Sequence, residues 1–124
     1  MRSVQSRVRG LGSAKEGTAH WWAQRLTAVA LVPLVIWYVV SLVSLAGADH
    51  DRVVEWLQSP FVAIASLLLI AVTLHHGQLG VQVVIEDYVH APKTKTVLLV
   101  LNKFAALVLG ACAAFAVLKV AFAG

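Results

Sequence analysis

The sequence predicts an all-α membrane protein with three transmembrane helices, and two observations carry this prediction. Of the 124 residues, 60% are hydrophobic and 13% are charged, whereas water-soluble domains carry about a quarter charged residues. The apolar residues also fall into three long blocks, and each block reaches the roughly 20 residues that a helix needs to cross a bilayer. A soluble core of this size could not bury three such blocks, so we expect lipid to be the solvent.

The three predicted spans cover about residues 22–46, 60–85 and 97–122. Trp21 and Trp22 open the first span as aromatic residues suited to the membrane interface. Ser59 and Pro60 open the second, as a capping residue followed by a proline at the first helical position. Residues 47–57 and 86–96 are predicted to be polar connections. Residues 1–20 are predicted to be a cytoplasmic N-terminal tail, and residues 21–124 a three-helix transmembrane anchor domain.

The basic residues predict the orientation, because Lys and Arg gather in the cytoplasmic loops of membrane proteins. The segment up to Arg25 and the second connection hold more of them than the first connection, which has only Arg52. The N-terminus should therefore be cytoplasmic, and the C-terminus should lie on the other side of a membrane that the chain crosses several times. The formal net charge of +4 does not indicate nucleic acid, because no basic patch is interleaved with aromatic residues.

Most polar residues are explained by solvation at the ends of the predicted spans. The exceptions lie in or beside the second span: His75, His76, Asp87 and Tyr88. His76 precedes Asp87 by eleven residues, which places it about 16 Å deeper along a helix and near the middle of the hydrocarbon layer. Eleven residues is also close to three full turns, so both share one face with Gly80. An ionisable side chain at that depth is a candidate functional residue.

Two interpretations of this face stay open on residue pattern alone. The histidines can simply donate hydrogen bonds to neighbouring helices, with Gly80 as a packing glycine. A neutral imidazole at the midplane beside a glycine also suits an axial haem ligand. His75 and His76 cannot sandwich one iron, because adjacent residues lie about 100° apart around a helix. A second histidine ligand would have to come from another subunit.

Similar alternatives apply at the cytoplasmic ends of the first two spans. Arg25 can extend its charge to the interface, or pair with an anionic group such as a haem propionate. The neighbouring Thr27 can donate a hydrogen bond or only pack. Asp87 and Tyr88 can be an ordinary helix end, or they can serve a quinone, with Tyr88 donating a hydrogen bond to its carbonyl and Asp87 carrying protons.

These residues together resemble the hydrophobic membrane anchor subunit of bacterial succinate dehydrogenase, in its alphaproteobacterial form. The pattern is RxTA at the start of the first span, here Arg25 to Ala28, and H-x3-G-x6-DY in the second, here His76 to Tyr88. The resemblance covers essentially the whole chain, and it implies a multi-pass protein of a bacterial inner membrane with its C-terminus periplasmic.

The resemblance implies a membrane anchor of succinate:quinone oxidoreductase, respiratory complex II, which passes electrons from succinate oxidation to quinone. It implies that His76 binds the iron of haem b, which is shared with a cytochrome b anchor subunit, and that Arg25 contacts a propionate. Tyr88 would bind ubiquinone, the substrate, with Asp87 delivering protons. A second histidine, His75, departs from many relatives.

The same resemblance implies that the chain is a non-catalytic subunit. Succinate would be oxidised by a flavoprotein subunit and an iron–sulfur subunit, since this chain has no dinucleotide fingerprint and no cysteine cluster. Two other functions compete: a small proton-path or transporter subunit, and a structural assembly protein without haem. The first would place polar side chains at one depth on several spans, and the second would make the shared face of His76, Gly80 and Asp87 a coincidence.

Overall fold

The computed structural model describes residues 13–123, and for residues 13–16 and 123 it describes only the backbone. Within this range the chain forms four α-helices, which are α2 (Ser13–Ser44), α3 (His50–Gln58), α4 (Pro60–Tyr88) and α5 (Pro92–Ala123). The predicted all-α class is confirmed. Three helices contain a segment long and apolar enough to cross a membrane, namely Gly17–Ser44, Pro60–Tyr88 and Pro92–Phe122. Residues 1–12 of the predicted tail lie outside the described residues.

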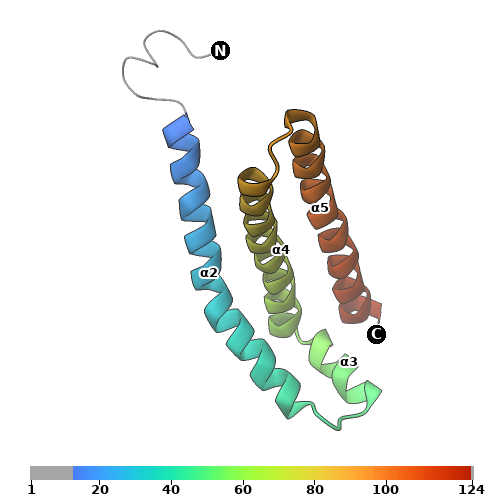
Figure 1. Ribbon diagram of the computed structural model, residues 1–124. Coiled ribbons are helices and arrows are strands. Elements are labelled where there is room, and N and C mark those ends of the chain that lie inside the picture. Colours follow the sequence, from blue (N-terminus) through green and yellow to red (C-terminus); the bar gives the residue numbers. More distant parts are fainter. Residues whose placement is uncertain (1–12, 124) are drawn as a thin grey trace.

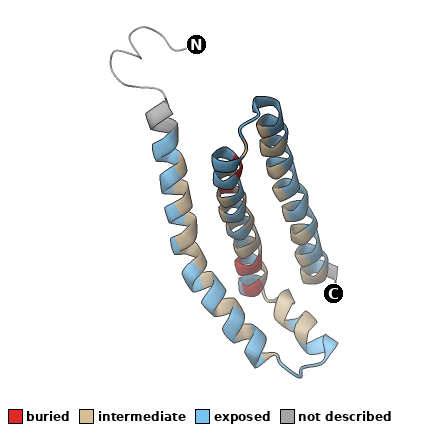
Figure 2. Ribbon diagram, viewed as in Figure 1, coloured by how far each residue is buried: buried red, intermediate tan, exposed pale blue. Residues whose placement is uncertain are grey.

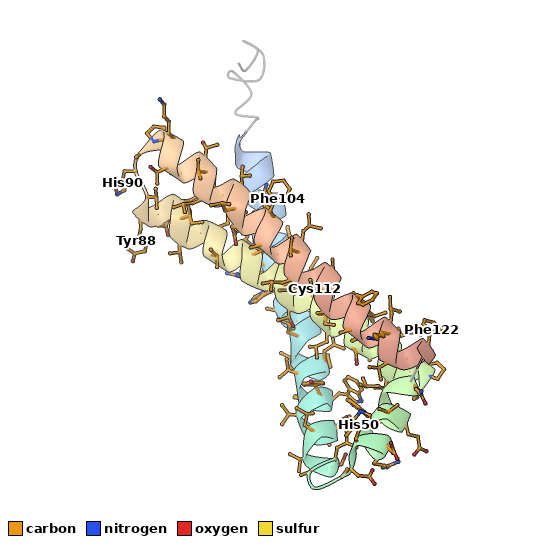
Figure 3. The ribbon with its side chains drawn as sticks, turned by 90° about the vertical axis from the view of Figure 1, so that its right-hand side faces the viewer. His50, Tyr88, His90, Phe104, Cys112 and Phe122 are labelled. Carbon is orange, nitrogen blue, oxygen red and sulfur yellow. The ribbon has the colours of Figure 1, made fainter. Side chains whose placement is uncertain are left out.

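The long helix α4 lies in the middle of the molecule (Figure 1). It packs against α5, which runs antiparallel beside it, and against α2 on its other side. The C-terminal half of α2 diverges from α5 and leads into α3 (Figure 3). Within the described residues, α2 and α5 do not pack against each other. Every interhelical contact of α2 with a second long helix is therefore made to α4.

The first predicted connection contains a helix, α3, where we expected only a polar loop. Gly47 adopts a φ of 80°, a left-handed conformation that glycine reaches without steric cost, and this turns the chain after α2. Asp49 then caps α3, because its side chain accepts a hydrogen bond from the backbone N–H of Arg52 at 2.9 Å. Val53 and Trp56, one turn apart, are half-buried, whereas Asp51 is exposed. This connection is an amphipathic helix.

The second span begins where the sequence predicts. α4 starts at Pro60 with Ser59 as its N-cap residue, although the Ser59 side chain makes no capping hydrogen bond. The helix continues to Tyr88, past the predicted end near residue 85. α5 begins already at Pro92, so proline at the first helical position explains this start as it does that of α4.

Two contacts set how closely α5 approaches α4. A Cβ atom added to Gly110 would lie 3.1 Å from Cδ1 of Leu74, which is tighter than an ordinary van der Waals contact, so glycine lets the two helices come close. Nearer the start of α5, the side-chain amide of Asn102 donates a hydrogen bond of 2.9 Å to the backbone carbonyl of Gln78. In an apolar surrounding such a bond fixes the lengthwise position of one helix against the other.

Burial is confined to α4 among the described residues (Figure 2). The buried side chains are Val62, Ala65, Ser66, Leu79 and Ile85, while α2 and α5 expose many large apolar side chains, including Val29, Phe104 and Phe115. A water-soluble protein rarely exposes so much apolar surface. The arrangement suits helices whose outer faces meet lipid or further transmembrane helices.

An aromatic cluster joins α2, α3 and α4 at the end of the molecule that carries α3. The Trp37 ring stacks on Trp56 with centroids 6.0 Å apart and meets Phe61 edge-on at 6.0 Å. The backbones of α2 and α3 do not pack closely, and the Trp37–Trp56 stack is a side-chain contact that links these two helices.

Replacing Trp37 with alanine should therefore destabilise this end of the fold. Each aromatic pair contributes about 0.5–1.5 kcal/mol beyond its buried area, so losing the pairs with Trp56 and Phe61 should cost about 1–3 kcal/mol in addition to the lost burial. We expect a lower thermal midpoint of the detergent-solubilised protein for Trp37→Ala. The matched control is Trp22→Ala, because Trp22 is 54% exposed and its ring pairs only with the adjacent Trp21. Equal losses in the two variants would contradict the role of the cluster.

Candidate functional site

The best-defined polar contact between two helices lies at His76, in the seam between α2 and α4. The His76 ring is half-buried, and its Nδ1 lies 2.9 Å from Oγ1 of Thr27 on α2. His76 is sixteen residues from the start of α4 and twelve from its end, or about 24 Å and about 18 Å along the helix axis. The imidazole therefore stands near the middle of a helix long enough to cross a bilayer.

The Thr27 hydroxyl is held by its own helix as well. Its Oγ1 lies 2.7 Å from the carbonyl oxygen of Ala23 and 3.1 Å from that of Gln24. A threonine inside a helix commonly donates to the carbonyl three or four residues earlier. No hydrogen bond to Nε2 of His76 is formed by the residues that the structure describes.

Gly80 follows His76 by about one turn and faces α2, as the helical phase predicts. The atom that comes nearest to a Cβ built on Gly80 is Nε2 of Gln24, at 3.9 Å, so a methyl group here would be in ordinary contact with α2. Two polar atoms on the same stretch of α2, Oε1 of Gln24 and Nε2 of His20, are buried without a hydrogen-bond partner. Buried polar atoms are normally paired, so this stretch of α2 has polar capacity that the described residues do not use.

His75 belongs to a different surface. It is exposed and lines a groove between α4 and α5 together with Gln78 and Lys103. The two adjacent histidines therefore serve different helix pairs, as the 100° separation between neighbouring residues requires. Only His76 shares a seam with α2.

Arg25 and Thr27 lie close together in the sequence but have different surroundings. Arg25 is exposed, and its guanidinium carbon lies 4.8 Å from the ring centroid of Trp21, one turn earlier on α2. This is a cation–π contact, and it orders the guanidinium without using its N–H donors. Those donors remain available for an anionic group.

Asp87 and Tyr88 end α4, on the side where the chain turns into α5. Both are exposed, and Tyr88 is 78% exposed; Figure 3 shows its ring at this end of the molecule, near His90. The structure thus separates the predicted residues into two groups, one at mid-helix and one at the end of α4. It brings His76 and Thr27 together, and leaves Tyr88 open to a partner or ligand.

A row of hydrogen-bonded polar side chains on α4 was not singled out from the sequence. The Gln78 amide donates to Oε1 of Gln82 at 3.3 Å, and the Gln82 amide donates to Oε1 of Glu86 at 3.0 Å. Their spacing of four residues is the signal that could have revealed the row. It runs from mid-helix toward the end that carries Tyr88.

The metal-binding capacity of the described part of the chain is limited to single ligands. No group of three or more His, Cys, Asp or Glu side chains gathers there. An axial haem ligand requires only one imidazole with a free ring nitrogen, and His76, whose Nε2 is not hydrogen-bonded by any described residue, fits that requirement.

The fold and this site define a class: a helical membrane protein with three candidate spans and one imidazole in the middle of a helix seam. Comparison with known proteins then gives the family, since residues 1–118 match the model for the succinate dehydrogenase/fumarate reductase transmembrane subunit. The chain belongs to this family and is one of its membrane anchor subunits.

Similar curated proteins carry matching names. The succinate dehydrogenase hydrophobic membrane anchor subunit of Rickettsia bellii is 34% identical over 97 residues, which cover 78% of each chain. The anchor subunit of Paracoccus denitrificans is 33% identical over 90 residues, 71% of this chain and 70% of its own. The one from Reclinomonas americana is 34% identical, over 67% of this chain and 72% of its own. No solved structure gives a significant match.

Proposed function

We propose that this chain anchors a succinate:quinone oxidoreductase in a bacterial inner membrane, supplies one axial ligand of haem b, and forms part of a ubiquinone site. The observation that carries the proposal is His76, a half-buried imidazole at mid-helix whose ring is bonded to α2 through one nitrogen only. A haem b bound there would take up and release single electrons. The second axial ligand would come from a cytochrome b anchor subunit.

Arg25 on α2 and two residues at the end of α4 complete this proposal. Arg25, whose guanidinium N–H groups no described residue uses, would pair with a haem propionate. Tyr88 would donate a hydrogen bond to a quinone carbonyl, and Asp87 would deliver protons to the reduced ring. Electrons would reach the quinone from an iron–sulfur subunit, which receives them from a flavoprotein that oxidises succinate. The N-terminus and the turn between α4 and α5 would face the cytoplasm.

The proton-path alternative predicted polar side chains at one depth on more than one span. α5 does supply Asn102 near the depth of Gln78, but its amide is already bonded to the Gln78 carbonyl. An amide used in this way links two helices, and it does not ionise as a proton-carrying group would. Membership of the anchor family and the geometry at His76 both favour the anchor function.

The decisive test compares the two adjacent histidines. His76→Leu should lower the haem-to-flavin ratio of the purified complex by more than about tenfold, since even outer partners of a metal ligand are worth about 10–100-fold in affinity. His75→Leu is the matched control, because His75 faces the groove between α4 and α5, and it should retain haem. Difference spectra of reduced minus oxidised complex measure the b-type band. Retention of haem in His76→Leu would refute the proposal.

Arg25→Leu should keep the helix but remove the charge partner of a propionate. We expect retained haem with a lowered reduction potential, because a cation near the propionates favours the reduced, less positive haem. A redox titration monitored at the b-type band measures this. Trp21→Leu, which removes only the ring beneath the guanidinium, should shift the potential less. An unchanged potential in Arg25→Leu would leave this residue as an interfacial anchor.

Tyr88→Phe should slow quinone reduction without affecting succinate oxidation coupled to a soluble dye, which takes its electrons from the soluble subunits. Only one hydroxyl is removed, and a hydrogen bond is worth about 1 kcal/mol net and more when its partner stays buried, so we expect a loss of roughly fivefold to a hundredfold in quinone turnover. Asp87→Asn should slow the same activity. Wild-type turnover and quinone affinity in Tyr88→Phe would rule out its quinone role.

A further inference from the structure

The contact between α2 and α4 at His76 carries an inference about which ring nitrogen is free. We propose that Thr27 is a positioning residue: its hydroxyl oxygen accepts a hydrogen bond from Nδ1–H of His76 and so leaves Nε2 as the iron-binding nitrogen. This inference rests on the proposed haem-binding function. It adds a residue on α2, a different helix from that of the ligand, to the haem site.

The direction of the hydrogen bond follows from the surroundings of the Thr27 hydroxyl. A hydroxyl has one hydrogen to donate and two lone pairs that accept. Its oxygen lies 2.7 Å from the carbonyl oxygen of Ala23, and two oxygens approach this closely when a hydrogen lies between them. The hydroxyl hydrogen is therefore used on the helix's own backbone. Toward His76, at 2.9 Å, the hydroxyl can only accept.

This direction fixes the tautomer of the imidazole. A neutral histidine carries one N–H, and the other ring nitrogen has the free lone pair. If Nδ1 donates to Thr27, the lone pair is on Nε2, which no described residue contacts through a hydrogen bond. Metal-binding histidines characteristically donate their second ring N–H to a neighbouring acceptor, which orients the ring and raises its basicity.

The acceptor is itself rigid, which makes it suited to orienting a ring. The Thr27 side chain is β-branched and its hydroxyl is held by the α2 backbone through Ala23 and Gln24, so its χ1 rotation is restricted. The surrounding α2 face is half-buried at Gln24 and Thr27, which limits competition from water. The His76 ring is thus attached to α4 and is oriented by a hydrogen bond to α2.

The test uses the assembled complex and replaces the Thr27 hydroxyl while keeping the shape of the side chain. Thr27→Val should bind haem about tenfold more weakly, measured as faster transfer of haem to a haem-scavenging apoprotein. It should also raise the haem reduction potential, because an imidazole without its Nδ1–H acceptor donates less charge to ferric iron. The low-spin ferric g-values in the electron paramagnetic resonance spectrum should shift. Thr27→Ser, which keeps the hydroxyl, should stay close to the wild type in all three measurements.

The outcomes separate this inference from the proposed function. Wild-type haem affinity, potential and g-values in Thr27→Val, alongside haem loss in His76→Leu, would overturn the role of Thr27 and leave His76 as the ligand. Haem retention in His76→Leu would overturn both. If Thr27→Val does not assemble, Thr27→Ala and Thr27→Ser make the same comparison with smaller side chains. Similar shifts in Ala and Ser would show that only the methyl group matters and would refute the inference.

Discussion

The structure depends on the lack of water inside a bilayer. Backbone groups in hydrocarbon must be satisfied within helices, and a polar side chain there must find a partner on its own helix or on a neighbour. Ser41 follows this rule locally by donating to the Trp37 carbonyl at 2.8 Å. Thr27 and Asn102 follow it across helix seams, toward His76 and the Gln78 carbonyl. The few interhelical polar bonds are therefore also the points that fix how the helices sit against one another.

The sequence predicts the single helices well because lipid demands long apolar blocks and the helical period then assigns the faces. The three spans and the common face of His76 and Gly80 follow from this, while the start at Pro60 follows from the proline at the first helical position. The helix α3 was missed because its charged residues suggested only a polar connection, although Asp49 is a capping residue and Val53 and Trp56 have helical spacing. Periodicity within one helix carries no information on the register between two helices. For this reason the sequence does not predict that Thr27 contacts His76 or that Trp37 contacts Trp56, and the three-dimensional structure is needed to find these pairs.

The described chain has the features of one part of a larger membrane assembly. Only α4 buries side chains, and the apolar surfaces of α2 and α5 remain exposed. Apolar exposure alone would suit lipid, but the row from Gln78 through Gln82 to Glu86 would not. Such a row, like the unpaired polar atoms of His20 and Gln24, suits contact with another subunit or with a polar ligand. This agrees with the family, whose members are named as subunits.

The contact at His76 gives a physical reason why the two sequence patterns of this chain belong together. Thr27 lies in the pattern that opens the first span and His76 in the pattern of the second, 49 residues apart. Neither pattern alone specifies a site, since a threonine inside a helix usually donates to its own backbone and a lone histidine can bond to any neighbour. When α2 packs on α4, the hydroxyl has already used its hydrogen on Ala23 and can only accept from the imidazole. The hydrogen bond from Thr27 to its own helix thereby determines that Nε2 of the His76 ring remains free. The two patterns therefore form one site only when α2 and α4 are in register.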